Sequence, residues 1–334
     1  MTRKRILSGM RPTGPLHIGH LVGALSNWTD LQDEFECYYM VADWHALMSE
    51  YANPVDIPKN STDNVADWLA CGIDPEKSTI FVQSDVPEHT ELHVILSCIT
   101  PIPWLERVPT YKEQMQELKD KDLTNYAFLG YPCLQAADIL IYKASVVPVG
   151  EDQVAHLELT REITRRFNTL YGEVFPEPEP RLTRTARLLG LDRRKMSKSY
   201  GNAIEIGESP EETRKKIMTM FTDPQRQRRN DPGRPEICNV YDYYKVFAPD
   251  RADAVPEGCR KAEIGCVDCK KEIAERLNQH LEPIRARRND LTAHPGKIED
   301  ILREGCKKAR RVAAATLDEA RQAMGLGRSR VTVD

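Results

Sequence analysis

Short apolar runs alternate with stretches of helical spacing in the first half of the chain. Residues 5–10 (RILSGM), 37–42 (CYYMVA) and 79–82 (TIFV) have the length and composition of short buried strands. Turn-forming Gly and Pro residues separate these runs from the helical stretches that follow. Strands that alternate with helices form parallel sheets covered by helices. The pattern therefore predicts an α/β fold built on a doubly wound parallel sheet.

From residue 209 onward the pattern is mostly helical. Ser209, Pro210 and Glu212 supply an N-cap residue, a proline in the first turn and an acidic residue three positions after the cap. Residues 268–289 and 297–324 predict two long amphipathic helices, both rich in Arg and Lys. We therefore expect the C-terminal third of the chain to be helical.

The change of pattern near residue 205 divides the chain. We expect the sheet domain to span residues 1–205 and a smaller all-helical domain to span residues 206–334, whose last helix could pack back on the sheet domain. Residues 175–180 (FPEPEP) cannot form a helix, and they predict an exposed extended loop within the first domain.

Composition and charge exclude several classes of protein. The chain has 334 residues, of which 40% are hydrophobic, so it can bury two cores. The longest apolar run, residues 138–150, contains Lys143 and Pro148 and is too short to cross a bilayer. Because the N-terminus lacks the apolar segment of a signal peptide, we expect a cytosolic protein. Up to Glu205 the chain has 21 Lys and Arg against 29 Asp and Glu, whereas after Glu205 it has 26 against 22. The basic excess of the C-terminal part favours contact with a polyanion.

The segment after the first strand has the composition of an anion-binding turn. Residues 9–20 (GMRPTGPLHIGH) join a Gly and Pro turn to a predicted helix start, where backbone N–H groups and the positive helix end favour an anion. His17 and His20 are three residues apart and share a helical face, and Gly19 leaves room for a flat base. Taken alone, two such histidines are more often surface residues or core polar pairs.

A second basic segment lies at residues 193–202 (RRKMSKSYGN). Lys195 and Lys198 flank serines in a short loop that could close over a polyphosphate. A lysine ammonium is a compact charge suited to a leaving pyrophosphate. On its own, this segment would be better explained as a solvated basic loop.

Together, the two segments resemble the paired motifs of class I aminoacyl-tRNA synthetases. Residues 41–47 (VADWHAL), 100–111, 130–142 and 147–161 narrow the resemblance to bacterial tryptophanyl-tRNA synthetases. It is dense over residues 6–202 and looser in the helical part. The resemblance implies a Rossmann-like catalytic domain, a helical anticodon-binding domain and a homodimer. It also implies L-tryptophan, ATP with Mg²⁺ and tRNA(Trp) as substrates, with tryptophanyl-adenylate as the intermediate.

The resemblance also implies roles for individual residues. Asp138 is expected to accept the indole N–H of tryptophan, Gln153 to bind the polar end of the amino acid, and Val147 and Val149 to wall the indole pocket. The expected catalytic residues are His17, His20, Lys195 and Lys198. The expected ATP-binding residues are Arg11, Pro12, Thr13, Gly19, His20, Gly150, Glu151, Asp152, Lys195, Met196, Ser197, Lys198 and Ser199. Many relatives have Gln where this chain has Arg11 and Asn where it has His20. Arg11 and His20 can still donate hydrogen bonds.

Four cysteines cluster in the basic part of the chain. Cys238, Cys259, Cys266 and Cys269 follow a C-x20-C-x6-C-x2-C pattern, whereas the other five are scattered. In a reducing compartment such clustered thiols indicate a tetrahedral metal site rather than disulfides. Zinc and a [4Fe-4S] cluster both accept four thiolates, and the single C-x2-C pair favours the cluster. A similar pattern in a subset of tryptophanyl-tRNA synthetases supports the cluster, with Zn²⁺ as the alternative.

Two other functions fit part of the sequence. Tyrosyl-tRNA synthetases share the fold, but residues 130–142 and 149–153 favour the tryptophan enzyme. An inactive synthetase-like regulator that binds tRNA or senses redox state is disfavoured, because both motifs are intact. The residues expected to contact tRNA are the arginines of the two long helices, including Arg285, Arg287, Arg288, Arg310 and Arg311.

Overall fold

The computed structural model describes residues 3–109, 124–150, 153–182, 188–197 and 200–326, and these build a parallel five-stranded sheet. The strands are β1 (Arg5–Met10), β2 (Glu36–Val41), β3 (Ser78–Val82), β4 (Val146–Val149) and β5 (Glu179–Leu182). Their order is β3-β2-β1-β4-β5, and every neighbouring pair is parallel. The chain therefore winds outward from β1 to one edge and then returns to wind toward the other, which confirms the predicted doubly wound sheet.

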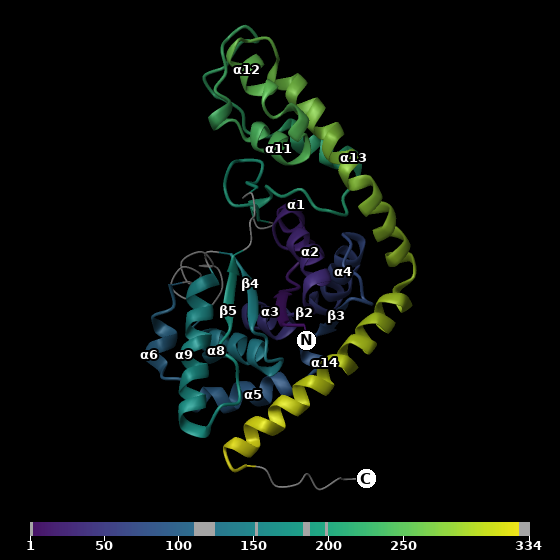
Figure 1. Ribbon diagram of the computed structural model, residues 1–334. Coiled ribbons are helices and arrows are strands. Elements are labelled where there is room, and N and C mark those ends of the chain that lie inside the picture. The colour runs from purple at the N-terminus through teal and green to yellow at the C-terminus, as the bar shows by residue number, and fades with distance from the viewer. Residues whose placement is uncertain (1–2, 110–123, 151–152, 183–187, 198–199, 327–334) are drawn as a thin grey trace.

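Helices cover both faces of this sheet (Figure 1). Those of the sheet region are α1 (Ile18–His20), α2 (Ser26–Glu34), α3 (Asp43–Glu50), α4 (Ile57–Ala70), α5 (Glu88–Ser97), α6 (Ile102–Glu106), α8 (Tyr126–Ile141) and α9 (Val154–Tyr171). Neighbouring strand residues point to opposite faces. Tyr39 accordingly belongs to the core shared with α2 and α4, and Tyr38 to the core shared with α5, α8 and α9.

The C-terminal part is helical, as predicted. It contains α10 (Pro210–Met218), α11 (Asn239–Phe247), α12 (Ala254–Arg260), α13 (Cys266–Ala293) and α14 (Pro295–Ala323). Ser209 caps α10: its Oγ accepts a hydrogen bond from the Glu212 N–H, and Glu212 Oε2 accepts one from the Ser209 N–H, both at 3.2 Å. The cap assignment from the sequence is therefore confirmed.

One predicted loop is partly a strand. Residues 175–180 were expected to form an extended loop, but β5 begins at Glu179 and pairs Pro180 with Val147 of β4. A proline is tolerated there because β5 is an edge strand, where a missing N–H costs no hydrogen bond of the sheet. The extended backbone was predicted correctly, and its pairing was not.

The last helix crosses the free edge of β3. In Figure 1, α13 leaves the group of α11 and α12 and runs down to α14, which passes the sheet. Gly305 of α14 lies so close to β3 that a Cβ there would come 1.8 Å from the Ile80 carbonyl oxygen. Ala309, Ala313 and Leu317 continue this contact into the core formed with α5 and α8. Small residues thus let α14 lie directly on the sheet region.

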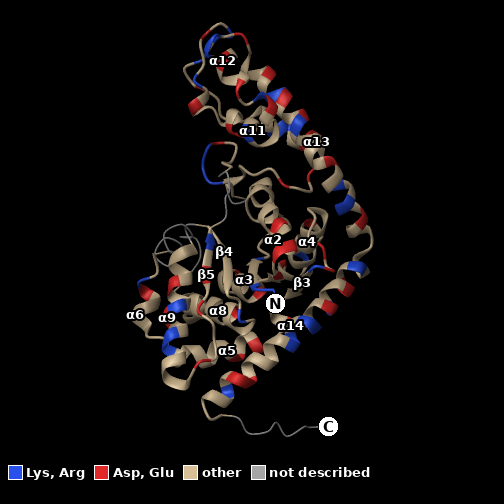
Figure 2. Ribbon diagram, viewed as in Figure 1, with Lys and Arg blue, Asp and Glu red and all other residues tan. Residues whose placement is uncertain are grey.

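Arginines fasten the two long helices to the rest of the molecule. Basic and acidic side chains alternate along α13 and α14 (Figure 2). Side chains of four arginines donate to Thr213 Oγ1, Ala70 O, Asp67 Oδ1 and Glu88 Oε1 at 2.6–3.1 Å, from Arg285, Arg287, Arg288 and Arg310 respectively. Arg311 is exposed. Contact of these residues with tRNA stays a prediction, but the first four have structural partners.

None of the helices in the described part of the chain is both long and apolar enough to cross a membrane.

Candidate active site

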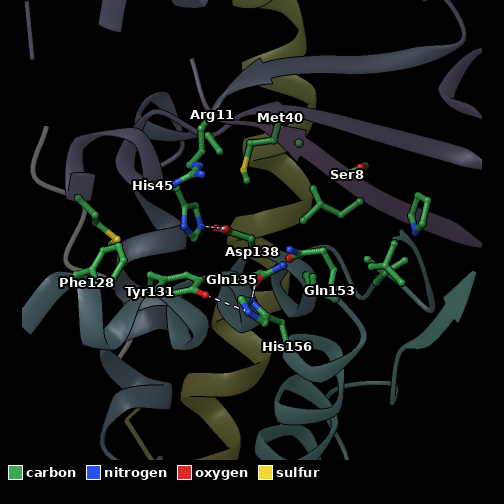
Figure 3. Close-up of a pocket in the computed structure, with 18 residues that line it drawn as sticks. Ser8, Arg11, Met40, His45, Phe128, Tyr131, Gln135, Asp138, Gln153 and His156 are labelled. Atoms are coloured by element: carbon green, nitrogen blue, oxygen red, sulfur yellow. Dashed lines mark hydrogen bonds and ion pairs between the residues drawn. The ribbon is translucent and has the colours of Figure 1, made fainter. Parts of the chain in front are cut away.

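A cavity of about 280 Å³ opens between β1 and β4 at the carboxyl end of the sheet (Figure 3). The chain winds in opposite directions from these two neighbouring strands, and doubly wound sheets bind ligands at that point. The strands pair at Ile6 and Val146, and the residues beyond that pair line the cavity. The lining residues are Leu7, Ser8, Gly9, Arg11, Met40, Ala42, His45, Met48, Phe128, Tyr131, Gln135, Asp138, Ile139, Val147, Pro148, Val149, Gln153 and His156.

Asp138 lies on α8 and is held by three hydrogen-bonding side chains. Its Oδ1 accepts from Gln83 Nε2 (2.7 Å) and lies 2.7 Å from His89 Nδ1, while its Oδ2 lies 2.7 Å from His45 Nε2. Burial alone would raise the pKa of Asp138, but the hydrogen bonds from His45 and His89 outweigh burial and hold the pKa below its usual value. Asp138 is therefore an ionised carboxylate in the cavity wall.

The other residues predicted to contact the amino acid line the same cavity. Val147 and Val149 are buried and two residues apart on β4, so they present the same face. Gln153 precedes α9, and its backbone N–H donates to the Gly150 carbonyl oxygen (3.0 Å). Arg11, predicted to bind ATP, also lines the cavity and has an exposed side chain. The structure brings these residues together, and their individual roles stay predictions.

The first predicted nucleotide-handling segment pairs with the residues that directly follow the second segment. The Ile18 N–H donates to the Ile204 carbonyl oxygen, and the Ile206 N–H donates to the Leu16 carbonyl oxygen, both at 2.9 Å. Met196 of the second segment is buried in the same apolar core as Leu16. The first segment and the strand-like stretch after the second therefore form one structural unit. The described residues of both segments, apart from Gly9 and Arg11, do not line the cavity.

His17 and His20 are packed closely and are uncharged. Their ring centroids are 3.8 Å apart, and the His17 backbone N–H donates to His20 Nδ1 (3.2 Å). Gly19 is required between them, because a Cβ there would lie 2.9 Å from His17 Nδ1. Burial lowers the pKa of His17 to about 4 and that of His20 to about 3. Both rings are therefore neutral near pH 7, and their predicted contact with a ligand would be by hydrogen bonds rather than by charge.

Asn202 organises the turn that carries Lys195. Its Oδ1 accepts from the Ser197 N–H (2.8 Å), and its Nδ2 donates to Asp192 Oδ1 (2.8 Å) and to the Lys195 carbonyl oxygen (3.2 Å). Gly190 makes room for this amide, since a Cβ there would lie 2.4 Å from Asn202 Nδ2. The Lys195 side chain is exposed. A backbone held by these hydrogen bonds thus presents an exposed cation.

The structure describes only some of the remaining residues that were predicted to bind ATP. Pro12 is buried and Thr13 exposed in the turn after β1, where the Thr13 N–H donates to the Arg11 carbonyl oxygen (2.9 Å). Four further residues predicted to bind ATP lie outside the described part of the chain, namely Glu151, Asp152, Lys198 and Ser199.

The sequence interpretation missed the residues that hold Asp138. His45 lies shortly after β2, and Gln83 directly follows β3, with His89 at the start of α5. Polar residues just past the carboxyl end of a buried strand gather at the ligand-binding edge of a parallel sheet. That position was the available signal for His45 and Gln83. His89 offered none, because its contact depends on how α5 packs against α8.

The four clustered cysteines line one small cavity in the helical part. Cys238 precedes α11, Cys259 lies on α12, and Cys266 and Cys269 lie on the first turn of α13. Arg226 reaches the same cavity, with its Nη1 3.7 Å from Cys259 Sγ and 3.9 Å from Cys266 Sγ. In the ranges that the structure describes, no three His, Cys, Asp or Glu side chains are arranged as metal ligands. The four thiols therefore lie around one cavity, but their arrangement does not establish a metal centre.

Comparison with known proteins identifies the family. Residues 2–282 match the model of the class I tRNA synthetases (W and Y). The chain is 57% identical to a tryptophan–tRNA ligase of Thermotoga maritima over 96% of this chain and 99% of the relative, and 43% identical to one of Aquifex aeolicus over 96% and 100%. A crystal structure of Campylobacter jejuni tryptophanyl-tRNA synthetase, complexed with ADP and tryptophan, matches 96% of this chain and all of that one with a TM-score of 0.87 and 34% identity. The chain belongs to the class I tRNA synthetases.

Proposed function

We infer that the chain is a tryptophan–tRNA ligase. Identity of 57% over nearly the full length of the Thermotoga relative supports tryptophan as the amino acid. Two solved tyrosyl-tRNA synthetases share only 24% and 18% identity with the chain, which is a likeness of fold alone. The intact first motif and the exposed Lys195 disfavour an inactive regulator.

The observation that carries this function is that Asp138 and several apolar side chains line one cavity at the switch point of the sheet. An ionised carboxylate between Val147, Ile139 and Phe128 is suited to a flat apolar ligand with one N–H donor, which describes indole. Gln153 is then close enough, in the same cavity, to bind the amino acid's polar end. We propose these contacts for tryptophan.

The proposed first step is in-line attack of the tryptophan carboxylate on the α-phosphate of ATP. This step forms tryptophanyl-adenylate and releases pyrophosphate, and ATP enters as its Mg²⁺ complex. Neutral His17 and His20 would donate hydrogen bonds to phosphate oxygens, while Lys195, with Lys198, would offset the charge that develops on pyrophosphate. Arg11 would meet the reacting groups from the cavity wall. Positioning of this kind needs no protein nucleophile.

In the proposed second step, the tryptophanyl group passes to the terminal ribose of tRNA(Trp). A terminal hydroxyl oxygen attacks the adenylate carbonyl, and AMP leaves. The basic excess of the C-terminal part supports contact of that part with the tRNA. We therefore keep the division into a catalytic domain, residues 1–205, and an anticodon-binding domain, residues 206–334, as part of the proposal.

Pyrophosphate exchange tests the first step directly. The full chain is expected to exchange labelled pyrophosphate into ATP with tryptophan and not with tyrosine. Asp138→Asn keeps the size of the side chain but removes the negative charge, and we expect it to raise KM for tryptophan by about 100-fold while KM for ATP changes little. Exchange with tyrosine, or an unchanged KM for tryptophan in the variant, would contradict the assignment.

We also propose that Cys238, Cys259, Cys266 and Cys269 hold a [4Fe-4S] cluster. Four soft thiol donors around one cavity fit iron and sulfur, and the nearby guanidinium of Arg226 would offset the negative charge of four thiolates. The bound cluster would cross-link three separate segments of the helical part. This proposal places the enzyme in a reducing compartment such as the cytosol, and Zn²⁺ is the alternative.

Metal analysis of anaerobically purified protein decides between the two metals. Iron and acid-labile sulfide in equal amounts, with broad visible absorption, support the cluster. Cys259→Ser is expected to lose both signals, whereas Cys98→Ser, at an exposed cysteine away from the cavity, is expected to keep them. A colourless protein with bound zinc would refute the cluster and retain the thiol site.

A second copy of the chain is the proposed partner at an apolar surface beside the active site. Val94 of α5, Ile102 of α6 and Tyr126 of α8 expose 60%, 59% and 74% of their surfaces, and α8 packs against both other helices. Exposed apolar groups of this size favour a protein interface. Sedimentation is expected to give a dimer for the native chain and a monomer for a Val94→Asp, Ile102→Asp double variant.

A further inference from the structure

We propose that His89 is the positioning residue that keeps Asp138 a pure hydrogen-bond acceptor for the substrate N–H, and that Tyr142 holds His89 in the tautomer this requires. The inference rests on the proposed role of Asp138 in binding the indole group. His89 is fully buried and is not one of the residues that line the cavity, so it acts through Asp138 and does not contact the ligand.

The hydrogen bonds around His89 determine which nitrogen carries its proton. Its Nε2 lies 2.7 Å from Tyr142 Oη, and its Nδ1 lies 2.7 Å from Asp138 Oδ1. Tyr142 is fully buried, and burial raises its pKa well above the ordinary value, so its hydroxyl keeps the proton. That proton has His89 Nε2 as its acceptor, because an unpaired buried hydroxyl would be costly. His89 Nε2 is then bare, and Nδ1–H donates to Asp138.

Two further donors complete the arrangement. Gln83 Nε2 donates to the same Oδ1, and rotating this amide would place its oxygen against the carboxylate. His45, which lines the cavity, has its Nε2 2.7 Å from Oδ2, and the dashed line in Figure 3 marks this contact. With donors on both oxygens, Asp138 is stabilised as the anion and has no proton to offer. A ligand can therefore only donate to it, and indole has a donor and no acceptor.

The titratable groups around Asp138 come from α3, α5 and α9 and from the residues that directly follow β1 and α8. They are His45 of α3, His89 and His93 of α5, Tyr142 after α8 and, across the cavity, Arg11 and His156. Of these, His45 and His89 donate directly to the carboxylate, and His89 is the one that the ligand cannot displace. Loss of the His89 donor removes stabilisation of the anion while burial remains, so protonated Asp138 should become populated at working pH.

Exchange kinetics over a range of pH test this proposal in the full chain. We expect His89→Leu to raise KM for tryptophan by about 10-fold or more at neutral pH, and this KM to fall again as the pH rises, because the carboxylate must first lose its proton. KM for ATP should change by less than about 2-fold. His89→Asn, whose amide can replace the Nδ1–H donor, should restore KM to within about 3-fold of the wild-type value. Tyr142→Phe should show the same pH trend, more weakly.

An analogue separates positioning from loss of structure. Benzothienylalanine carries sulfur in place of the indole N–H, and the wild-type preference for tryptophan over it should shrink by about 10-fold in His89→Leu. The matched control is Cys133→Ala, a buried change on α8, the helix of Asp138, at a thiol that lies 3.7 Å from Thr100 Oγ1. It should leave that preference and the pH profile unchanged, whatever it does to the melting temperature.

The outcomes distinguish the positioning role of His89 from the proposed binding role of Asp138. If Asp138→Asn raises KM for tryptophan but folded His89→Leu and Tyr142→Phe keep the wild-type KM, preference and pH profile, the positioning role is wrong and the role of Asp138 stands. Equal losses in His89→Leu and Cys133→Ala for both substrates would also overturn it. If Asp138→Asn itself has no effect on KM for tryptophan, both proposals fail.

Discussion

Burial decides the chemistry of His17 and His20 at the scale of the single residue. Both rings sit where protein replaces water on most sides, and positive charge on His17 would also disfavour charge on His20. Their positively charged forms are disfavoured for these reasons. A phosphate site with neutral imidazoles gains directed hydrogen bonds without adding charge, so the cations must come from mobile side chains such as Lys195. In the proposed mechanism, the histidines therefore supply hydrogen bonds to the polyphosphate and the lysines supply positive charge.

His20→Asn is predicted to make the protein less sensitive to acid. The pKa of His20 is about 3 in the folded protein and near 6.5 in the unfolded chain, so the unfolded chain binds the extra proton as the pH falls below 6.5. Its contribution to stability is therefore present at neutral pH and lost toward pH 4. Urea midpoints at pH 7 and pH 5 should fall more in the wild type than in His20→Asn. A larger fall in the variant would contradict the buried, neutral state of His20.

At the scale of elements, the contact of α14 with β3 depends on a single missing side chain. An edge strand exposes unpaired N–H and C=O groups, and covering it is one way to prevent strand addition by another chain. Gly305 lets the helix backbone approach Ile80 closely enough to do this. Ion pairs then hold the helix along its length, including Lys143 with Glu319 (2.6 Å) and Arg310 with Glu88 (3.1 Å).

Gly305→Ala is predicted to destabilise the protein by about 3 kcal/mol, because its Cβ would overlap the Ile80 backbone and force α14 away from the strand. Gly296→Ala is the matched control on the same helix. A Cβ at Gly296 meets nothing within 4 Å, so this change should be neutral or stabilise by up to about 1 kcal/mol through helix propensity. Thermal unfolding of both variants tests the contact, and equal melting temperatures would refute it.

The periodicity of apolar residues was sufficient to predict individual helices and strands. Which elements contact one another depends on how they pack, and the pattern does not specify this. The two long helices and the Ser209 cap follow from spacing and side-chain type, both of which act within a few residues. The pairing of Pro180 with Val147 could not be predicted, since it depends on where the chain returns to the sheet. Likewise, Asp138 was identified through a resemblance, whereas the contact between His89 and Asp138 arises only when α5 and α8 pack together.

At the scale of the whole molecule, α13 connects the cysteine cavity to the catalytic sheet. Its first turn carries Cys266 and Cys269, and farther along Arg288 Nε donates to Asp67 Oδ1 of α4 (2.6 Å). Asp67 also accepts a hydrogen bond from the backbone of Leu16, next to the first nucleotide-handling segment. A rigid helix and one buried ion pair therefore join the helical part to the expected ATP site.

Arg288→Met is predicted to weaken this connection strongly. Removing the cation takes the charged partner from Asp67, whose side chain is 2% exposed, which costs up to about 3–5 kcal/mol at a pH where the carboxyl is ionised. Transfer of tryptophan to tRNA should fall more than pyrophosphate exchange, because only transfer requires the two parts of the molecule to keep their relative placement. The Asp67→Asn, Arg288→Met double variant should recover most of the stability, since its amide can still accept the hydrogen bond from Leu16.

The pH dependence of these variants follows from Asp67. Burial raises its folded pKa to about 6, although Arg288 opposes the rise. A carboxyl whose folded pKa lies above its unfolded value favours folding at low pH, and that contribution is lost as the pH rises through 6. In Arg288→Met the opposing cation is gone, so the loss should continue to higher pH and the stability gap to the wild type should widen between pH 5 and pH 8. The double variant has no carboxyl at this position and lacks the wild type's own loss, so in urea unfolding its gap to the wild type should narrow as the pH rises through 6 and then stay constant. A gap that widens equally in both variants would place the titrating group elsewhere.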